Sequence, residues 1–388
     1  MRIVHITRTL DPAAGGLQVY PVRLAAAQAA LGHEVWLASE RDGSAVDGTP
    51  PAFEGVPGAD RVRVGWVTPS DAWAMLGLGA AWYQCRDLIS GADICHIHGL
   101  WEPVLWVAAK VARSAQVPYL VAPHGMLDPW ALGQKKWKKW LGMLVGWRSI
   151  LNRAAGVHCL NVDEERLIAD LGLRSPPVRI GNGIFLDEVD PLPPADEFAA
   201  CRSELSGHPY ILFLSRLHYK KGLDILAAAF REVAAIEPRV HLVVAGPDGG
   251  AKGEFEQLIE AAGLGERVHI VGRISVRDKW AALAGAACFC LPSRQEGFSS
   301  AILEALAARV PVVISDACHF PEVAEVGAGE VVSLAADNVA AALRRILASD
   351  DLRRQMGAAG RNMVEERFTW RMTAERSLRV YEQSLSGR

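Results

Sequence analysis

Short apolar runs recur along the chain and alternate with longer segments whose apolar residues fall at helical spacing. The runs Tyr210–Leu214 and Ala287–Leu291 are typical of strands that a parallel sheet buries on both faces. Leu223–Ile236 has the spacing of an amphipathic helix. Because strand and helix patterns alternate in both halves, the sequence predicts an α/β fold with two doubly wound parallel sheets and crossover helices.

The chain is too long for one average core. It has 388 residues, half of them hydrophobic, so two domains are expected. A proline- and acid-rich stretch at 187–197 is the best linker candidate. We therefore predict an N-terminal domain at 1–190, a linker at 191–208, a C-terminal domain at 209–370 and a final helix at 371–388. The N-terminal strands are expected near Ile3, Val35, Ile94, Tyr119, Val157 and Val178.

Two glutamates, eight positions apart, flank a predicted strand-to-helix turn. Glu296 follows the run that ends at Leu291, and Glu304 lies on a predicted helix that begins near Ser299 or Ser300. Both carboxylates are expected at the crevice beyond the carboxyl end of the strand, where open α/β sheets bind ligands. A glutamate in the first turn of a helix can also be only a partner for the helix dipole, and this alternative stays open for Glu304.

The backbone between these glutamates suits a phosphate. The N–H groups of Gly297, Phe298, Ser299 and Ser300 lie at the positive end of a helix dipole. The flanking carboxylates accept hydrogen bonds from hydroxyl groups. A ligand that carries both phosphate and several hydroxyls is a nucleotide sugar.

A second strand-to-helix turn carries cations. Arg216 and Lys221 follow the run Tyr210–Leu214, and they offer a bidentate fork and a point charge to a leaving diphosphate. Lys220 is better explained as a solvated loop residue. The chain contains no Asp-x-Asp pair, so the sequence predicts no metal-bridged phosphate and no metal ligand.

These motifs resemble the retaining glycosyltransferases of family 4, which have the GT-B fold of two Rossmann-like domains facing a cleft. The resemblance covers nearly the whole chain. It implies that Glu296 binds hydroxyls of the transferred sugar, that Glu304 binds the nucleotide ribose, and that Arg216 and Lys221 hold the diphosphate. It also implies that the base contacts backbone near Arg273, and that the final helix returns to the first domain. The expected donor-binding residues are Gly16, Arg216, Lys221, Gly246, Arg273, Glu296, Gly297, Phe298, Ser299, Ser300 and Glu304.

The N-terminal half offers an acceptor site. Gly15 and Gly16 follow the first strand, where the family places a glycine-rich loop, although a turn that needs positive φ explains paired glycines equally well. His98 and Trp101 follow the strand at Ile94–His98. We expect Gly15, His98 and Trp101 to contact the acceptor; for His98, a histidine whose hydrogen bonds are satisfied within the sheet is the alternative.

His124 follows the strand Tyr119–Ala122. It matches the position at which many family members carry a histidine that contacts the transferred sugar. The resemblance therefore makes His124 catalytic, together with Arg216, Lys221 and Glu296. The run from Trp130 onward resembles a subgroup associated with bacterial exopolysaccharide, capsule or O-antigen assembly.

A basic helix with an apolar, tryptophan-bearing face is predicted at Lys135–Arg153. This composition suits the surface of an anionic membrane. An equally good explanation is that its tryptophans pack on the domain's own core. The net charge of −3 gives no bulk attraction to nucleic acid, and none is expected as a partner.

Seven cysteines occur without a CxxC motif, which suits a reducing compartment. The first strand begins at Arg2, and no apolar run reaches the roughly 18 residues of a spanning helix. We therefore expect a cytoplasmic protein, with peripheral association at the inner face of the membrane if the basic helix binds lipid.

The sequence thus predicts a metal-independent, retaining transfer of a hexose-type sugar from a UDP- or GDP-linked donor to an acceptor hydroxyl, with no other cofactor. The expected acceptor is a saccharide or a lipid-linked saccharide of surface polysaccharide synthesis. Two alternatives stay open. A nucleotide-sugar epimerase would share the fold and the diphosphate site. A non-enzymatic sugar-binding protein would not need the pair Arg216 and Lys221.

Overall fold

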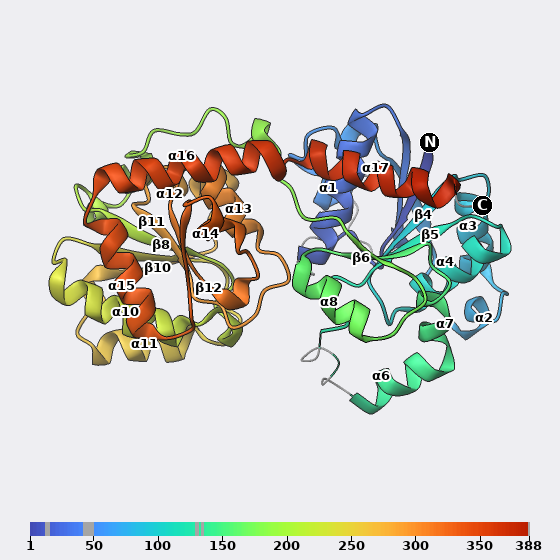
Figure 1. Cartoon of the computed structure of the whole chain (residues 1–388), viewed down its shortest axis with the longest axis horizontal. Coiled ribbons are helices and arrows are strands. Elements are labelled where there is room, and N and C mark those ends of the chain that lie inside the picture. Colours follow the sequence, from blue (N-terminus) through green and yellow to red (C-terminus); the bar gives the residue numbers. More distant parts are fainter. Residues whose placement is uncertain (12–15, 42–49, 129–131, 133–135, 387–388) are drawn as a thin grey trace. The chain divides into compact units, whose positions relative to one another are not determined.

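The computed structural model of the chain describes residues 1–11, 16–41, 50–128, 132 and 136–386, which form two compact units (Figure 1). Unit 1 comprises 1–182 and 370–388, and unit 2 comprises 183–369. The division therefore falls at 182/183, before the proline-rich stretch.

Unit 1 contains a seven-stranded parallel sheet in the order β3-β2-β1-β4-β5-β6-β7. Its central strand β1 pairs with β2 on one side and with β4 on the other, so Val4 lies between Trp36 and Cys95. The strand β3 was not among the predicted strands, because Gly65 interrupts its short apolar pattern. The strands are β1 (Arg2–Ile6), β2 (Glu34–Glu40), β3 (Arg63–Val67), β4 (Ile94–His98), β5 (Tyr119–Ala122), β6 (Gly156–Cys159) and β7 (Pro177–Arg179).

The final helix of the chain belongs to unit 1. It packs beside α1 (Figure 1). Gln28 of α1 donates a hydrogen bond of 2.8 Å to the hydroxyl of Ser377. Trp370, at its start, is only 1% exposed and meets the ring of Tyr20 edge-on. The helices of unit 1 are α1 (Gly16–Ala30), α2 (Ala72–Met75), α3 (Ala80–Ile89), α4 (Pro103–Ser114), α6 (Lys136–Gly142), α7 (Arg148–Leu151), α8 (Val162–Asp170) and α17 (Trp370–Ser386), with a π-helical turn at Met143–Trp147.

Unit 2 contains a six-stranded parallel sheet in the order β10-β9-β8-β11-β12-β13. The strands are β8 (Tyr210–Leu214), β9 (His241–Ala245), β10 (Val268–Gly272), β11 (Cys288–Leu291), β12 (Val312–Ser315) and β13 (Gly329–Val332). The helices are α9 (Glu197–Ala200), α10 (Leu223–Ile236), α11 (Lys252–Ala261), α12 (Val276–Gly285), α13 (Ser300–Ala307), α14 (Glu322–Glu325), α15 (Ala336–Leu347) and α16 (Asp350–Arg367).

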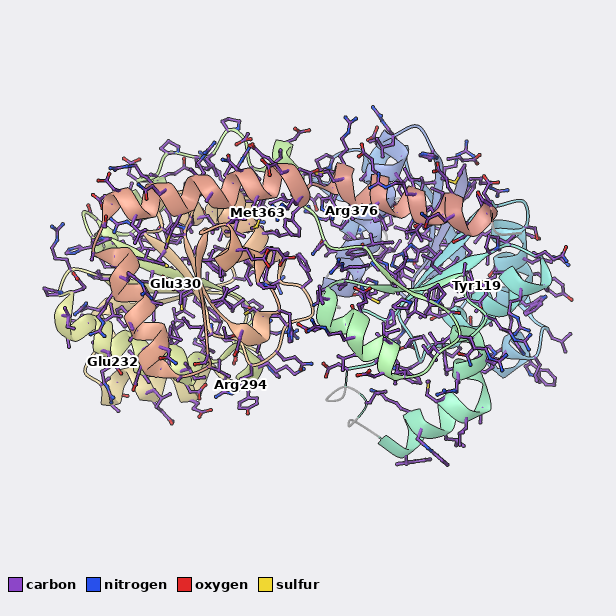
Figure 2. The ribbon with its side chains drawn as sticks, viewed as in Figure 1. Tyr119, Glu232, Arg294, Glu330, Met363 and Arg376 are labelled. Atoms are coloured by element: carbon purple, nitrogen blue, oxygen red, sulfur yellow. The ribbon has the colours of Figure 1, made fainter. Side chains whose placement is uncertain are left out.

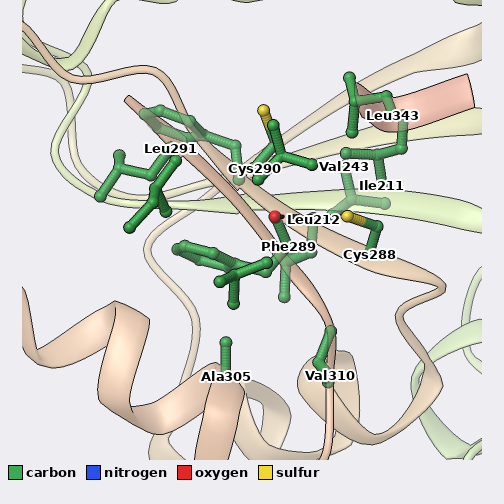
Figure 3. Packing of buried hydrophobic residues seen from close by; sticks show 14 of the residues in the cluster. Ile211, Leu212, Val243, Cys288, Phe289, Cys290, Leu291, Ala305, Val310 and Leu343 are labelled. Carbon is green, nitrogen blue, oxygen red and sulfur yellow. Dashed lines mark hydrogen bonds between the residues drawn. The ribbon is translucent and has the colours of Figure 1, made fainter. Parts of the chain in front are cut away.

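The core of unit 2 fixes the strand β11 against its neighbours. Figure 3 shows Cys288–Leu291 among Ile211 and Leu212 of the adjoining strand β8 and Val243 of β9, with Ala305 of α13 close by. All four residues of β11 are fully buried. Burial of a side chain as large as that of Phe289 contributes roughly 2–3 kcal/mol. The turn between β11 and α13 is therefore held at both ends by packed elements.

The segment 191–208, predicted as a linker, is part of unit 2. Phe198 and Leu205 are buried in its core, and the guanidinium of Arg202 lies over the Phe198 ring. The chain enters unit 2 earlier, where Arg361 of α16 binds Asp190 and the carbonyl oxygen of Ala307. The abundance of proline and acid in this stretch therefore reflects a packed surface loop.

All seven cysteines are free. Cys95, Cys159, Cys288 and Cys290 are fully buried, as their apolar surroundings in the sequence predicted. Burial raises the pKa of the Cys159 thiol to about 12, so this group is an uncharged core side chain. Over the described part of the chain, no helix is long and apolar enough to cross a membrane.

Gly222 is the N-cap of α10 and lies in the left-handed region, with φ of 69°. A Cβ at this position would lie 1.9 Å from the carbonyl oxygen of Pro292. We expect Gly222→Ala to lower the free energy of unfolding by about 3 kcal/mol or more, since the clash adds to the roughly 1–2 kcal/mol cost of the left-handed conformation. Gly263→Ala is the matched control, because Gly263 has a φ of 66° and nothing within 4 Å of its Cβ position. Urea denaturation measures both; equal losses in the two variants contradict the close contact.

Candidate functional site

The carboxyl ends of β8 and β11 lie side by side in unit 2. β8 pairs with β9 on one side and with β11 on the other, and β11 follows β9 and β10 in the sequence. The strand order therefore reverses between β8 and β11, and their carboxyl ends mark a topological switch point, where open α/β sheets bind ligands. The loops 215–222 and 292–299 follow these strands and contain the two predicted motifs.

Arg294, labelled in Figure 2, joins these two loops. Its backbone N–H donates to the carbonyl oxygen of Lys220 at 2.7 Å, and its guanidinium binds both carboxylate oxygens of Asp224 at 2.8 and 2.6 Å. The guanidinium also lies 4.5 Å from the centre of the Tyr219 ring. The hydrogen bond from Arg294 holds the pKa of Asp224 below its usual value. Sequence reasoning missed this residue, although it stands two positions before Glu296.

Lys221 and Glu296 form a direct ion pair. The Lys221 Nζ lies 2.5 Å from Glu296 Oε1, and the two side chains are 19% and 9% exposed. The backbone N–H of Glu296 also donates to the carbonyl oxygen of Ala317 at 3.1 Å. The structure therefore brings together the cation of the first predicted motif and the carboxylate of the second. Lys221 has three donors, so it can bind an anionic oxygen while it keeps Glu296 neutralised.

The helix α13 begins at Ser300 with Ser299 as its N-cap, one of the two N-caps that the sequence left open. The Ser299 hydroxyl makes no capping hydrogen bond, so the first N–H groups of the helix are left to a ligand or water. The Phe298 ring packs on Phe320 and Phe368, so this residue can offer only backbone to a ligand. Gly297 is exposed at the same turn.

Glu304 lies beyond the first turn of α13, so the dipole explanation does not apply to it. Its Oε1 accepts a hydrogen bond of 2.7 Å from the Nζ of Lys279, and both side chains are 19% exposed. Lys279 lies on α12 and also stacks 4.4 Å from the centre of the Trp280 ring. Sequence reasoning missed Lys279, because only the fold shows that α12 lies beside α13.

A pocket of about 230 Å³ opens at the same edge of the sheet. Arg216, Gly246, Arg273 and Lys279 line it, together with the apolar side chains of Leu214, Pro247, Ile274 and Val276. Among the residues that the structure describes, no carboxylate binds the guanidinium of Arg216. Three cationic side chains beside an apolar wall suit a ligand with a flat ring system and several negative charges.

His124 in unit 1 sits at the end of β5 in the left-handed region, with φ of 51°. The carboxylate of Glu164 accepts hydrogen bonds from the N–H groups of Gly125 and Leu160, at 2.8 and 2.7 Å, and so fixes the loop that carries His124. Burial raises the pKa of Glu164, and these two N–H donors oppose the rise. A strained backbone held by a buried carboxylate is typical of a functional position.

His98 does not face an open crevice, contrary to our expectation for an acceptor contact. It is fully buried, and its ring nitrogens pair with His5 at 2.9 Å and His124 at 3.1 Å. The alternative, a histidine satisfied within the sheet, is therefore the better one. Strand alternation failed as a guide because both faces of this parallel sheet are covered.

Trp101 is half-buried beneath α6 and the π-helical turn. Its ring meets Trp147 edge-on at 5.9 Å, and Lys139 Nζ lies 5.8 Å from its centre. These contacts give the side chain a packing role. Gly16 is the first residue of α1, and Gly15 lies outside the described residues.

His5, His96 and His98 bring their ring nitrogens within 4.8 Å of one another, which is close enough to hold a metal ion. All three are fully buried. Every nitrogen of the three rings already lies within hydrogen-bonding distance of another group. A metal would have to break those contacts, so the geometry favours a hydrogen-bonded cluster.

The predicted basic helix is divided by the structure. Trp147 is buried against Trp106 in the core of unit 1, whereas Trp140, Leu144 and Val145 are 65%, 61% and 71% exposed. Trp137 is also 67% exposed. The core-packing explanation therefore holds for Trp147, whereas the side chains of Trp137 and Trp140 stay exposed. Lys135 lies outside the described residues.

The sequence matches two family profiles. The family described as "Glycosyl transferases group 1" matches residues 199–363, and the "Glycosyl transferase 4-like domain" matches residues 15–183. A GDP-mannose-dependent monoacylated alpha-(1-6)-phosphatidylinositol monomannoside mannosyltransferase of Corynebacterium glutamicum is 30% identical over 81% of each chain. A phosphatidyl-myo-inositol mannosyltransferase of Mycobacterium leprae is 33% identical, but the match spans only 54% of each chain, about half its length.

The fold also recurs among solved structures. Sucrose-phosphate synthase from Thermosynechococcus elongatus superimposes with a TM-score of 0.76 at 22% identity, over all of both chains. This likeness and the two Rossmann-like parallel sheets confirm the predicted GT-B fold.

Removing Lys279 leaves the half-buried Glu304 carboxylate without its partner. We expect Lys279→Met to lower the free energy of unfolding by about 1–2 kcal/mol, since hydrogen bonds to charged groups contribute roughly that much. The matched control is Lys252→Met, whose pair with Glu256 is 44% and 50% exposed and should change stability by less than about 0.5 kcal/mol. The double variant Lys279→Met/Glu304→Gln should recover part of the loss; equal effects of the two single lysine variants contradict a specific pair.

Proposed function

Because this chain belongs to the family-4-type glycosyltransferases, we propose that it transfers a hexose from a nucleoside-diphosphate sugar to a hydroxyl of a lipid-anchored acceptor. The observation that carries the proposal is the arrangement at the switch point of unit 2. There Lys221 is paired with Glu296, Lys279 is paired with Glu304, and Arg216 stands beside a pocket of about 230 Å³.

In this proposal the pocket of unit 2 holds the nucleotide. The apolar wall and the backbone near Arg273 receive the base, and Glu304, held by Lys279, accepts hydrogen bonds from the ribose hydroxyls. Glu296 does the same for hydroxyls of the sugar. Arg216, Lys221 and the first N–H groups of α13 face the diphosphate.

The same donors assist the reaction. As the bond between the sugar and the diphosphate breaks, negative charge grows on the leaving oxygen, and Arg216, Lys221 and the α13 amides stabilise it. Removal of one preorganised donor of this kind commonly costs about a hundredfold or more in turnover. Since two side-chain cations supply this charge, the proposal includes transfer without an added divalent cation. Retention of anomeric configuration is also part of the proposal and rests on family resemblance.

The identity of the donor and acceptor follows the two relatives. Their names describe mannosyl transfer to phosphatidylinositol lipids, and one is named as GDP-mannose-dependent. We therefore propose a GDP-linked hexose as the first donor to test, with UDP-linked sugars second, and a glycolipid as the acceptor. This narrows the acceptor predicted from the sequence, a saccharide or a lipid-linked saccharide of surface polysaccharide synthesis.

A lipid acceptor agrees with the exposed part of the basic segment. Trp140, Leu144 and Val145 present apolar side chains in a stretch rich in lysine and arginine, which suits an anionic lipid surface. We propose that this segment docks unit 1 on the inner face of the membrane, where the acceptor is anchored.

The transfer assay compares adjacent lysines. With a GDP- or UDP-linked hexose and a phosphatidylinositol acceptor, Lys221→Ala should lower kcat by about a hundredfold or more, because it removes a donor to the leaving diphosphate. Lys220 binds Gln295 at 2.8 Å, so Lys220→Ala should change kcat by less than about threefold. The assay is run with and without EDTA, and the anomer of the first product is read by NMR. Equal losses in the two variants, or product formed without any acceptor, contradict the proposal.

Membrane docking is tested by flotation with liposomes. Trp140→Ser/Leu144→Ser should abolish binding to vesicles of phosphatidylglycerol at low salt, because it removes two exposed apolar anchors. Ile236→Ser is the control, since Ile236 is 56% exposed at the end of α10 in unit 2. Absence of binding by the unaltered protein, or an equal loss in the control, rules out this surface.

A further inference from the structure

A continuous series of hydrogen-bonded polar side chains, which we call the relay, runs through the interior of unit 1, from α17 to the end of β5. Consecutive members lie 2.7–3.2 Å apart. They come from two helices, three strands and one loop. The members are His5, Gln28, His96, His98, His124, His158, Ser377 and Tyr381.

The donor and the acceptor of each hydrogen bond can be assigned by starting at α17. The Ser377 hydroxyl donates to the carbonyl oxygen of Ala374 at 2.6 Å, so Ser377 must accept the hydrogen bond from Gln28. The Gln28 amide therefore turns its NH₂ group toward α17 and its Oε1 toward His5. Since Oε1 only accepts, the His5 Nε2, 2.7 Å away, must carry a proton.

This proton decides the tautomers of the next two rings. Burial lowers the pKa of His5 to about 4, so at neutral pH the ring has one proton and its Nδ1 accepts. His98 Nε2 must then donate to His5 Nδ1 at 2.9 Å. Burial also keeps the pKa of His98 well below its usual value, so its Nδ1 accepts from His124 Nε2 at 3.1 Å.

A second branch reaches the same conclusion from the opposite end. His158 Nε2 donates to the carbonyl oxygen of Ile180 at 2.7 Å, so its Nδ1 accepts from His96 Nε2. His96 Nδ1 must then accept from the Tyr381 hydroxyl at 2.7 Å, and Tyr381 accepts from the NH₂ of Gln28. Both ends of the relay thus require the same orientation of the Gln28 amide. In this arrangement no donor faces a donor, and no acceptor faces an acceptor.

We propose that this relay holds His124 in the neutral Nε2–H form and so presents its Nδ1, at the carboxyl end of β5, as an acceptor for a hydroxyl of the sugar substrate. His124 is half-buried, and among the described residues no hydrogen bond reaches its Nδ1. Gln28 and Ser377 act as positioning residues, because they set the tautomer of His124 through His5 and His98. The substrate role rests on the proposed transferase function; the tautomer does not.

The relay also explains why a polar cluster is buried without carboxylates. Burial lowers the pKa of His124 to about 3 and that of His158 to about 4, so the rings stay neutral at pH 7. Between His5, His96, His98 and His158, neutral rings that each donate once and accept once satisfy one another. A metal at His5, His96 and His98 would need lone pairs that these hydrogen bonds already use.

The first experiment reads the tautomers directly. The unaltered protein, labelled with ¹⁵N-histidine and free of substrate, is examined at pH 7 by two-bond ¹H–¹⁵N correlation. The expected result is the neutral Nε2–H pattern for His5, His98 and His124, each assigned by single substitution. A Nδ1–H tautomer or an imidazolium at His124 overturns the proposal, whether or not the transferase function holds.

Two variants then separate the branches. Gln28→Met removes the acceptor for His5, so His124 should show mixed tautomers and kcat/KM for transfer should fall about tenfold, the effect of one lost hydrogen bond of roughly 1.4 kcal/mol. Tyr381→Phe leaves the anchor at Ser377 intact, so the His124 tautomer and kcat/KM should change less than about twofold. Tyr119→Phe is the matched control for a buried tyrosine, since the Tyr119 hydroxyl donates to the carbonyl oxygen of Ile150, outside the relay.

Fluorinated donor sugars test the substrate role. Fluorine accepts but does not donate, so replacing the hydroxyl that binds His124 should lower kcat/KM about tenfold in the unaltered enzyme and much less in Gln28→Met. If every singly fluorinated sugar gives the same loss in both enzymes, His124 does not accept a substrate hydroxyl. If no transfer occurs with any nucleotide sugar, the proposed function and this role fail together, while the NMR result still decides the relay.

Discussion

The site in unit 2 depends on the contact between the loops that follow β8 and β11. Gly222 approaches the carbonyl oxygen of Pro292 so closely that no side chain fits between them. Ser293 and Arg294 both donate to the carbonyl oxygen of Lys220, at 2.8 and 2.7 Å. These bonds align the two loops at the switch point and bring Lys221 onto Glu296. Without that contact, a half-buried lysine and a half-buried glutamate would each bear an uncompensated desolvation cost.

Unit 1 is organised by a different constraint. Its buried histidines are stable only because each ring meets a complementary donor and acceptor, and these partners come from the sheet, from α1 and from α17. The hydrogen bonds of Gln28 with Ser377 and Tyr381 hold the last helix against α1. The bond with Ser377 also fixes the Gln28 amide, which sets the tautomer of His124 through His5 and His98. The C-terminal helix is thus part of the support of the site, although it lies far from His124 in the sequence.

The fold was readable from the sequence because its signals are local. Buried parallel strands appear as apolar runs, and α10 was predicted with its observed bounds, Leu223–Ile236. The turn carrying Glu296 and the start of α13 at Ser300 were also predicted correctly. What the sequence did not reveal depends on contacts between distant segments. Lys279 gains its role only when α12 meets Glu304 of α13, and Arg294 gains its role only when the loop after β8 meets the loop after β11.

Histidines were the hardest residues to interpret. The sequence presents His98 and His124 alike, each at the end of an apolar strand, yet one is buried with both nitrogens paired and the other keeps one nitrogen unpaired among the described residues. The difference lies in the left-handed backbone of His124 and in the hydrogen bond from the Gly125 N–H to Glu164. Neither feature leaves a signal in the spacing of apolar residues.

In the proposed function, the switch point of unit 2 binds a nucleoside diphosphate, and calorimetric titration with GDP, UDP and the corresponding nucleosides measures this binding. We expect one diphosphate to bind at least about a hundredfold more tightly than its nucleoside, a difference of roughly 2.7 kcal/mol, and Arg216→Ala to remove most of this difference. Equal affinities for diphosphate and nucleoside, or a difference unchanged in Arg216→Ala, would contradict this proposal.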